Sequence, residues 1–213
     1  MTLVGFKRLT IQPFASNGDL LSEPIVIEGK KDKGGTVSAE ISGLSKDPTK
    51  VSASNIAYYI SRKGTGDVSV DFGILDMIEE QLDIIMGYYK PDKIAYIGEN
   101  TEAPYCAALM ESENLQGEAA LLGFFSGTFS REKISANTLD VSKSFEPEAD
   151  SFTYSAMTTD HEGDQNGQVV AKYVGTDAAV IKTLSDQVLN PDDKKFTPAP
   201  APKAKAPTTV PKV

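Results

Sequence analysis

The chain has 213 residues, a formal net charge of −9 at pH 7, one cysteine and no tryptophan. This length allows a single domain that buries about 70% of the surface of its unfolded chain. Cys106 has no partner for an intrachain disulfide, so we expect a reducing cytoplasm. The longest apolar run, residues 119–125, is shorter than the roughly 20 residues that a membrane helix needs, so we expect no membrane partner.

The charge is unevenly distributed along the chain. Residues 194–213 hold five lysines and no acid, so the rest of the chain carries 30 acids against 16 bases. An acidic body repels nucleic acid, because binding to phosphates depends on lysine and arginine. From residue 196 onward, proline, alanine and lysine dominate and no core can form. We therefore predict a domain over residues 1–193 and a disordered tail over residues 194–213.

Short strands dominate the pattern of hydrophobic residues. Apolar and polar side chains alternate over residues 37–42, 68–72 and 152–156, which is the period of a half-buried strand. Turn-forming residues separate these segments from further strand candidates. The further candidates are residues 4–11, 25–28, 94–97, 105–112, 119–130 and 169–173.

A long excursion interrupts the strands before residue 67. Residues 51–76 mix apolar and basic side chains, contain no catalytic constellation, and return through Gly64-Thr65-Gly66 into a strand over residues 67–72. Ordering such a segment costs about 1–2 kcal/mol per residue in backbone entropy, and a partner surface would offset that cost. The segment therefore points to assembly.

Four side chains in this excursion are candidates for contact with a partner. Tyr58 and Tyr59 with Arg62 and Lys63 could stack on bases and hold phosphates. The same residue types are enriched at protein interfaces. The acidic body favours the protein interface.

Two helices are predicted. Leu75, Ile78 and Leu82 place an apolar stripe on a helix over residues 74–88. A second helix covers residues 177–189, with Thr176 as its N-cap and a proline after its end.

The sequence supplies little that resembles an active site. His161 is the only histidine and lies among carboxylates, which favours a polar turn over a metal site. The carboxylate pair Glu111 and Glu113 could serve acid–base chemistry or a solvated strand face. Cys106 lies in an apolar stretch typical of a buried, inert thiol. No linked nucleophile, base and oxyanion donor is present, so we expect neither an enzyme nor a cofactor or metal site.

An ordered set of segments resembles the major tail proteins of phages of Gram-positive bacteria that have long, non-contractile tails. The resemblance covers roughly residues 1–190 and is carried by residues 4–11, 27–34, 51–76, 105–117 and 145–155. It implies a mainly β fold with a flanking helix (α+β), that is, a β-sandwich or barrel of the phage tail-tube type with a long inter-strand loop. In that family, residues 43–66 match the loop that reaches a neighbouring subunit or ring, and residues 74–88 match the flanking helix.

The resemblance also implies a function and partners. Such subunits form hexameric rings that stack into a tube in the virion, through which double-stranded DNA passes without specific binding. The further partners are the tape measure, tail terminator and distal tail proteins. We predict that acids on the alternating strands, Glu40 and Asp71 among them, face the lumen. The alternative is a β-sandwich module of a virion that binds carbohydrate or a cell surface and does not polymerise.

Overall fold

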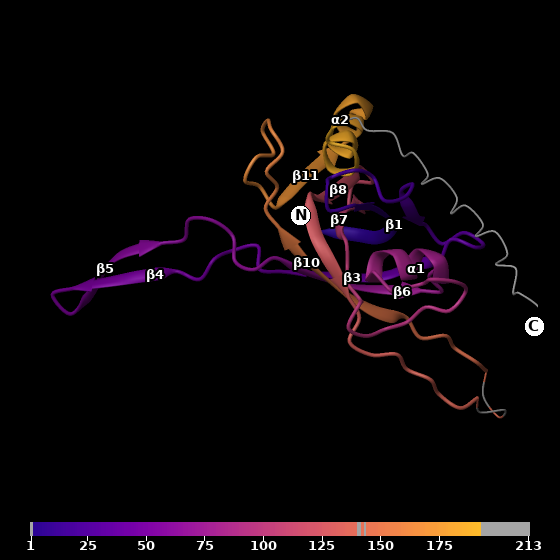
Figure 1. Ribbon diagram of the computed structural model, residues 1–213. Coiled ribbons are helices and arrows are strands. Elements are labelled where there is room, and N and C mark those ends of the chain that lie inside the picture. Colours follow the sequence, from indigo (N-terminus) through magenta and orange to yellow (C-terminus); the bar gives the residue numbers. More distant parts are fainter. Residues whose placement is uncertain (1, 140–141, 143, 193–213) are drawn as a thin grey trace, which may run out of the picture.

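Two antiparallel β-sheets pack face to face in the computed structural model, which describes residues 2–139, 142 and 144–192 (Figure 1). The predicted C-terminal tail lies outside the described residues. The first sheet has the order β11-β8-β7-β1-β2, and the second has the order β3-β6-β10-β9. The described strands form no closed barrel, so of the two predicted forms the sandwich is confirmed.

The strands of both sheets follow the predicted segments closely. The first sheet contains β1 (Leu3–Phe14), β2 (Ile25–Ile27), β7 (Tyr105–Asn114), β8 (Ala119–Phe124) and β11 (Val170–Gly175). The second sheet contains β3 (Gly35–Ser42), β6 (Ser69–Leu75), β9 (Ser126–Ser130) and β10 (Asp150–Met157). The predicted strand over residues 119–130 divides at Phe125, so its two halves belong to different sheets.

The main core lies between the sheets and is built by strand alternation. Val70, Phe72 and Ile74 on β6 are fully buried, whereas Asp71 between them is exposed. They meet inward side chains of the first sheet such as Leu9 and Ile11. Burial of side chains of this size stabilises a fold by about 1.5–3 kcal/mol each.

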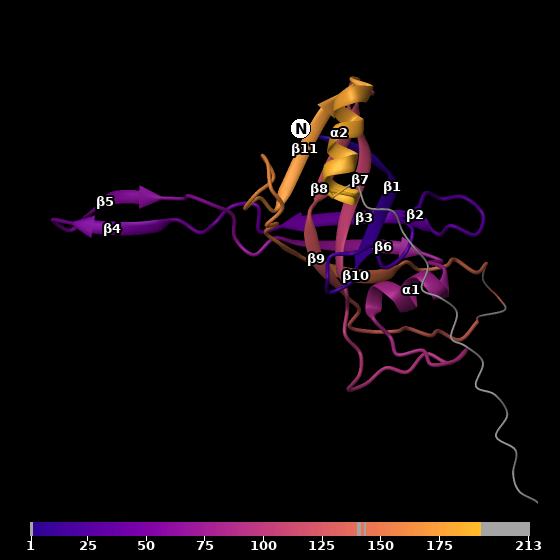
Figure 2. The ribbon, with the colours of Figure 1, turned by 45° about the horizontal axis from the view of Figure 1, so that its top comes forward.

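The two helices have different positions. α1 (Glu79–Met86) contributes Leu82, Ile85 and Met86 to the core between the sheets. α2 (Ala178–Leu189) packs on the opposite face of the first sheet, against β7, β8 and β11 (Figure 2). None of the described helices has the length and hydrophobicity to span a membrane.

Three sequence predictions need correction. α1 begins at Glu79 and not at residue 74, because residues 69–75 continue β6. The N-cap of α2 is Asp177 and not Thr176, since the Asp177 carboxylate accepts hydrogen bonds from the backbone N–H groups of Ala179 (2.9 Å) and Val180 (3.4 Å). Residues 94–97 form no strand, and Tyr96 makes only an isolated bridge with Tyr89.

Candidate assembly surfaces

The predicted long loop is a β-hairpin that projects away from the sandwich (Figures 1 and 2). It contains β4 (Thr49–Ala53) and β5 (Ile56–Ser61), which form a two-stranded sheet of their own. Ser54 and Asn55 both have positive φ, the geometry of the tight turns that join hairpin strands. We call residues 43–66 the arm.

The arm exposes large apolar side chains along both strands. Tyr58 is 78% exposed and Ile56 is 64% exposed, and Val51, Tyr59 and Ile60 are each more than half exposed. An isolated two-stranded hairpin is at best marginally stable in water. This apolar surface therefore points to a partner.

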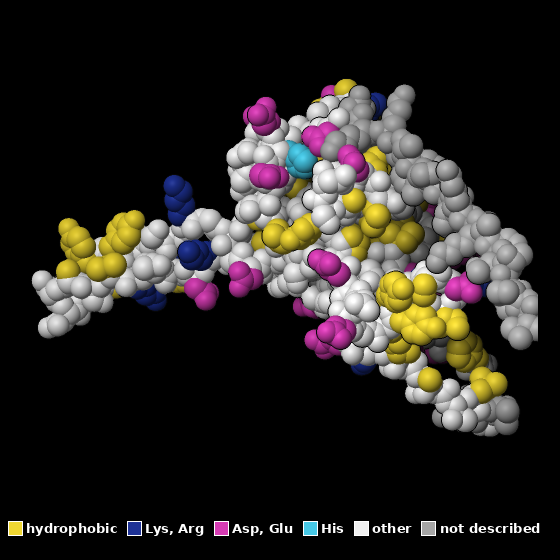
Figure 3. Space-filling view, viewed as in Figure 1, with side chains coloured by type: hydrophobic (Ala, Val, Ile, Leu, Met, Phe, Trp, Pro, Cys, Tyr) yellow, Lys and Arg dark blue, Asp and Glu magenta, His cyan; other side chains and the backbone are white. Residues whose placement is uncertain are grey.

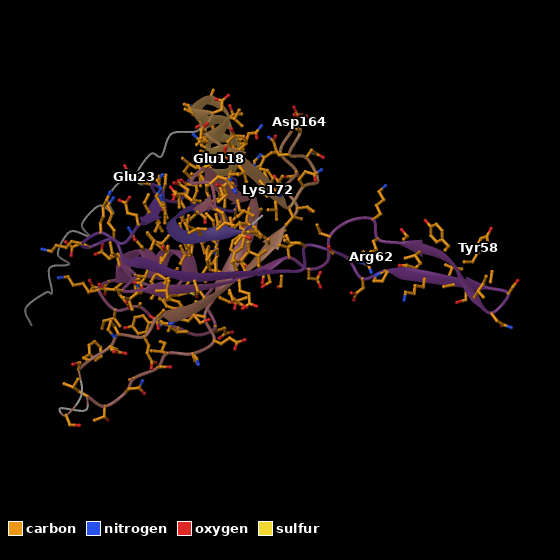
Figure 4. All side chains as sticks on the ribbon, turned by 180° about the vertical axis from the view of Figure 1, so that it is seen from behind. Glu23, Tyr58, Arg62, Glu118, Asp164 and Lys172 are labelled. Atoms are coloured by element: carbon orange, nitrogen blue, oxygen red, sulfur yellow. The ribbon has the colours of Figure 1, made fainter. Side chains whose placement is uncertain are left out.

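The arm is also basic. Residues 43–66 carry four basic side chains and one acid. Arg62 and Lys63 are exposed and form no ion pair with any described residue. Tyr58 and Arg62 lie along the arm, far from the labelled side chains of the sandwich (Figure 4). The structure thus brings the four predicted arm residues together on one protruding element.

The base of the arm is held by a close backbone approach. The Gly66 N–H donates to the Gly43 carbonyl at 2.9 Å, and Gly43 has a φ of 73°. A side chain at position 43 would meet the Asp67 carbonyl oxygen at 1.9 Å. Only glycine is compatible with this geometry. The arm therefore leaves the second sheet at a defined place.

The outward face of the second sheet is the other candidate surface. Three rows of directly paired residues cross β3, β6, β10 and β9. The rows are Ser42–Ser69–Ser155–Thr128, Glu40–Asp71–Thr153–Ser130 and Ser38–Gly73–Ser151. We call these residues the polar face. It consists of short polar side chains, one glycine and two acids, and it contains no basic residue.

Glu40 and Asp71 are directly opposite each other in the β3–β6 pair, and both are exposed. The Thr153 hydroxyl donates a hydrogen bond to the Asp71 carboxylate at 2.7 Å. Like charges in opposite positions of a sheet are destabilising. The chain therefore keeps two negative charges side by side on this face at a cost to its own stability.

The candidates for chemistry have structural roles. Glu111 forms a two-pronged ion pair with Arg8 across the β1–β7 pair, at 2.9 and 2.6 Å, and Glu113 pairs with Lys7. The hydrogen bond from Arg8 to Glu111 raises the pKa of the guanidinium. These contacts bind β1 to β7.

Cys106 and His161 do not form a reactive site with each other. Cys106 is fully buried, as predicted, and burial raises the pKa of its thiol to about 12. His161 lies in a polar loop, with its Nδ1 3.5 Å from an oxygen of Asp192. Within residues 2–139, 142 and 144–192, no three metal-ligating side chains come together.

Sequence reasoning missed most of the polar face. It identified the alternation on β3, β6 and β10 but considered only the acids among the outward residues. The signal was the repetition of serine and threonine at every second position on β9 and β10, together with Ser38 and Ser42 on β3. It also missed the exposed loop after α1, because no period of two or 3.6 residues marks it.

Two comparisons with known proteins bear on the family of this chain. A search of curated proteins finds no match to the chain. A family model described as "Phage tail tube protein" matches residues 14–190, which include both sheets from the end of β1 onward, the arm and both helices. The family is not an enzyme family but one of structural virion proteins. The chain therefore belongs to the phage tail tube protein family.

Proposed function

We propose that this structural protein of the virion tail forms hexameric rings that stack into a tube, with the polar face lining the channel through which DNA leaves the capsid. The observation that carries this proposal is the composition of the polar face. Its short hydroxyl side chains and its acids offer no cation to bind phosphates. Double-stranded DNA can pass such a wall without being held.

Ring closure requires an interface between different surfaces of neighbouring subunits. The second sheet ends in β3 on one side and β9 on the other, and both strands have an edge without a partner strand in the described chain. Pairing β3 of one subunit with β9 of the next would extend the sheet around the ring. It would also cover edges that otherwise promote uncontrolled aggregation.

The arm supplies the contact between subunits or rings in this proposal. Tyr58 and Tyr59 provide large apolar area, and Arg62 and Lys63 provide charge. Tyrosine and arginine often dominate the binding energy of interfaces. The tape measure, tail terminator and distal tail proteins are the further partners that we infer from the family, and a long non-contractile tail on a Gram-positive host stays a prediction.

Electron microscopy of the purified protein, with its mass in solution measured on the same sample, tests the proposal. We expect hollow tubes or rings with the mass of six subunits. Deleting residues 46–64 should abolish ring formation or stacking and leave the fold intact, because no side chain in β4 or β5 is buried. A protein that remains monomeric at high concentration, even with tail-tip complex added, would contradict the proposal and favour the binding module.

The proposed channel wall has its own test. Changing Glu40 and Asp71 together to lysine should leave tube assembly intact and impair DNA ejection, because lysines hold phosphates. The matched control is Glu23→Lys, at an exposed position in the segment between β1 and β2. Phages with the double substitution that infect as well as those with the control substitution would show that these acids do not face the DNA.

A further inference from the structure

We propose that the arm of one subunit docks on the surface formed by α1 and the loop that follows it in a second subunit. We call residues 79–102 the α1 face. The inference rests on the proposed function and goes beyond it by naming the surface that receives the arm. Three observations lead to it: exposed apolar area, opposite charge and position on the molecule.

The α1 face exposes four large hydrophobic side chains within nine residues of chain. Tyr89, Ile94, Tyr96 and Ile97 are between 51% and 64% exposed. Exposed apolar side chains that occur singly are normal, whereas clusters of them mark interaction sites. The rings of Tyr89 and Tyr96 lie 6.3 Å apart, which gives the face an aromatic pair to match the tyrosines of the arm.

The loop of the α1 face is held in place by its own hydrogen bonds. Tyr89 and Tyr96 exchange two backbone hydrogen bonds, at 3.2 and 2.8 Å. The Glu102 N–H donates to the Gly87 carbonyl at 3.3 Å, and a side chain at position 87 would meet the Glu102 carbonyl oxygen at 1.7 Å. The hydrophobic side chains are therefore presented on an ordered loop, which reduces the entropy cost of binding.

The charges of the two surfaces are opposite. Residues 79–102 carry six acids and two lysines, and Lys90 is already paired with Asp83. The hydrogen bond to the Asp83 carboxylate is the main cause that raises the pKa of Lys90, and the charges of Glu80 and Glu79 add to it. The arm carries four basic side chains and one acid. Opposite charges on two surfaces guide their association and fix the register of the interface.

The two surfaces lie at opposite ends of the molecule. The arm projects to one side of the sandwich, and α1 with its loop lies at the other side in both ribbon views (Figures 1 and 2). Hydrophobic side chains gather on the arm and again over the region of α1 and the loops beside it (Figure 3). The arm therefore cannot reach the α1 face of its own chain. Contact between unlike ends of two copies repeats from subunit to subunit, as polymer growth requires.

Reversal of charge on each surface, alone and together, tests the docking. One variant carries Lys50→Glu, Arg62→Glu and Lys63→Glu in the arm. The other carries Asp92→Lys, Glu99→Lys and Glu102→Lys, which are exposed positions in the loop of the α1 face. Each variant alone should raise the concentration needed for assembly at least ~10-fold, and a chain with all six changes should return to within about threefold of wild type.

Two controls keep the result specific. Thermal unfolding by circular dichroism must show that each variant is folded. Phe145→Ser removes an aromatic side chain that is 73% exposed on another loop and should leave assembly unchanged, whereas Tyr96→Ser should impair it.

The outcomes separate the two proposals. Assembly of wild-type protein and of both charge variants at the same concentration overturns the docking alone. Two impaired variants without rescue in the combined chain also overturn it, as does loss of assembly with Phe145→Ser but not with Tyr96→Ser. Wild-type protein that never assembles overturns the proposed function, and the docking with it.

Discussion

The outward faces of the two sheets differ in what covers them. The first sheet presents Ala107, Leu109 and Leu121, and α2 covers them with Leu184 and Val188. The second sheet presents serines, threonines and two acids on its outward face, and no described helix covers it. Both sheets use the same alternation of side chains. The outward residues therefore decide whether a sheet face is covered by a helix of the same subunit or stays exposed for contact with other molecules.

The largest loss of stability should come from weakening the packing of α2 on the first sheet. Leu184→Ala removes a side chain that is only 7% exposed between α2 and the first sheet. We expect the free energy of unfolding to fall by about 2–5 kcal/mol, because lost burial and a cavity add. Urea denaturation measures this. Val180→Ala, on the same helix but 41% exposed, is the control, and an equal loss in both variants would show that α2 is not packed as described.

The inward faces can be probed through the titration of Cys106. Burial raises the pKa of this thiol from 9.0 to about 12. Between these two values the unfolded state releases the thiol proton and the folded state keeps it. The stability that the buried, neutral thiol contributes is therefore complete below about pH 9 and is lost as the pH rises toward 12. Stability measured against pH should fall less steeply over this range in Cys106→Ala. Identical slopes would place the thiol in contact with solvent.

A smaller effect tests how α2 is held over the first sheet. Asp177→Ala removes the N-cap carboxylate that accepts two backbone hydrogen bonds. The loss should be about 0.5–2 kcal/mol, because two N–H groups lose their partner. Denaturation in urea provides the measurement, and Asp177→Asn should recover most of the loss. If Asp177→Asn loses as much stability as Asp177→Ala, the effect comes from the carboxylate's charge and not from its hydrogen bonds.

The smallest effect concerns the uncovered face and has the opposite sign. Glu40→Lys replaces the repulsion between Glu40 and Asp71 by attraction, so the isolated subunit should gain about 0.2–1 kcal/mol. Ser155→Ala on the same face should change stability by less than about 0.5 kcal/mol. Both values come from the same denaturation experiment. Destabilisation by Glu40→Lys would mean that the paired acids do not repel each other in the subunit.

Local patterns were enough to locate most strands. The alternation of Val70 and Phe72 with Asp71 depends only on the period of a strand, and the same pattern reveals β3 and β10. The break at Phe125 was not visible, because the apolar run over residues 119–125 continues directly into residues 126–130, although the two halves belong to different sheets. The start of α1 was misplaced because Leu75, the last residue of β6, lies at helical spacing from Ile78 and Leu82.

The sequence by itself determined the mainly β character, the burial of Cys106 and the place of the arm, because each depends on residues that are close together in the chain. It also indicated the family, through an ordered set of such local segments. The choice between sandwich and barrel came from the tertiary structure. Only the tertiary structure decided that Glu40 and Asp71 are opposite each other, that four strands combine into the polar face, and that the arm and the α1 face lie at opposite ends. Strand register and sheet order join residues far apart in sequence. No local pattern contains that information.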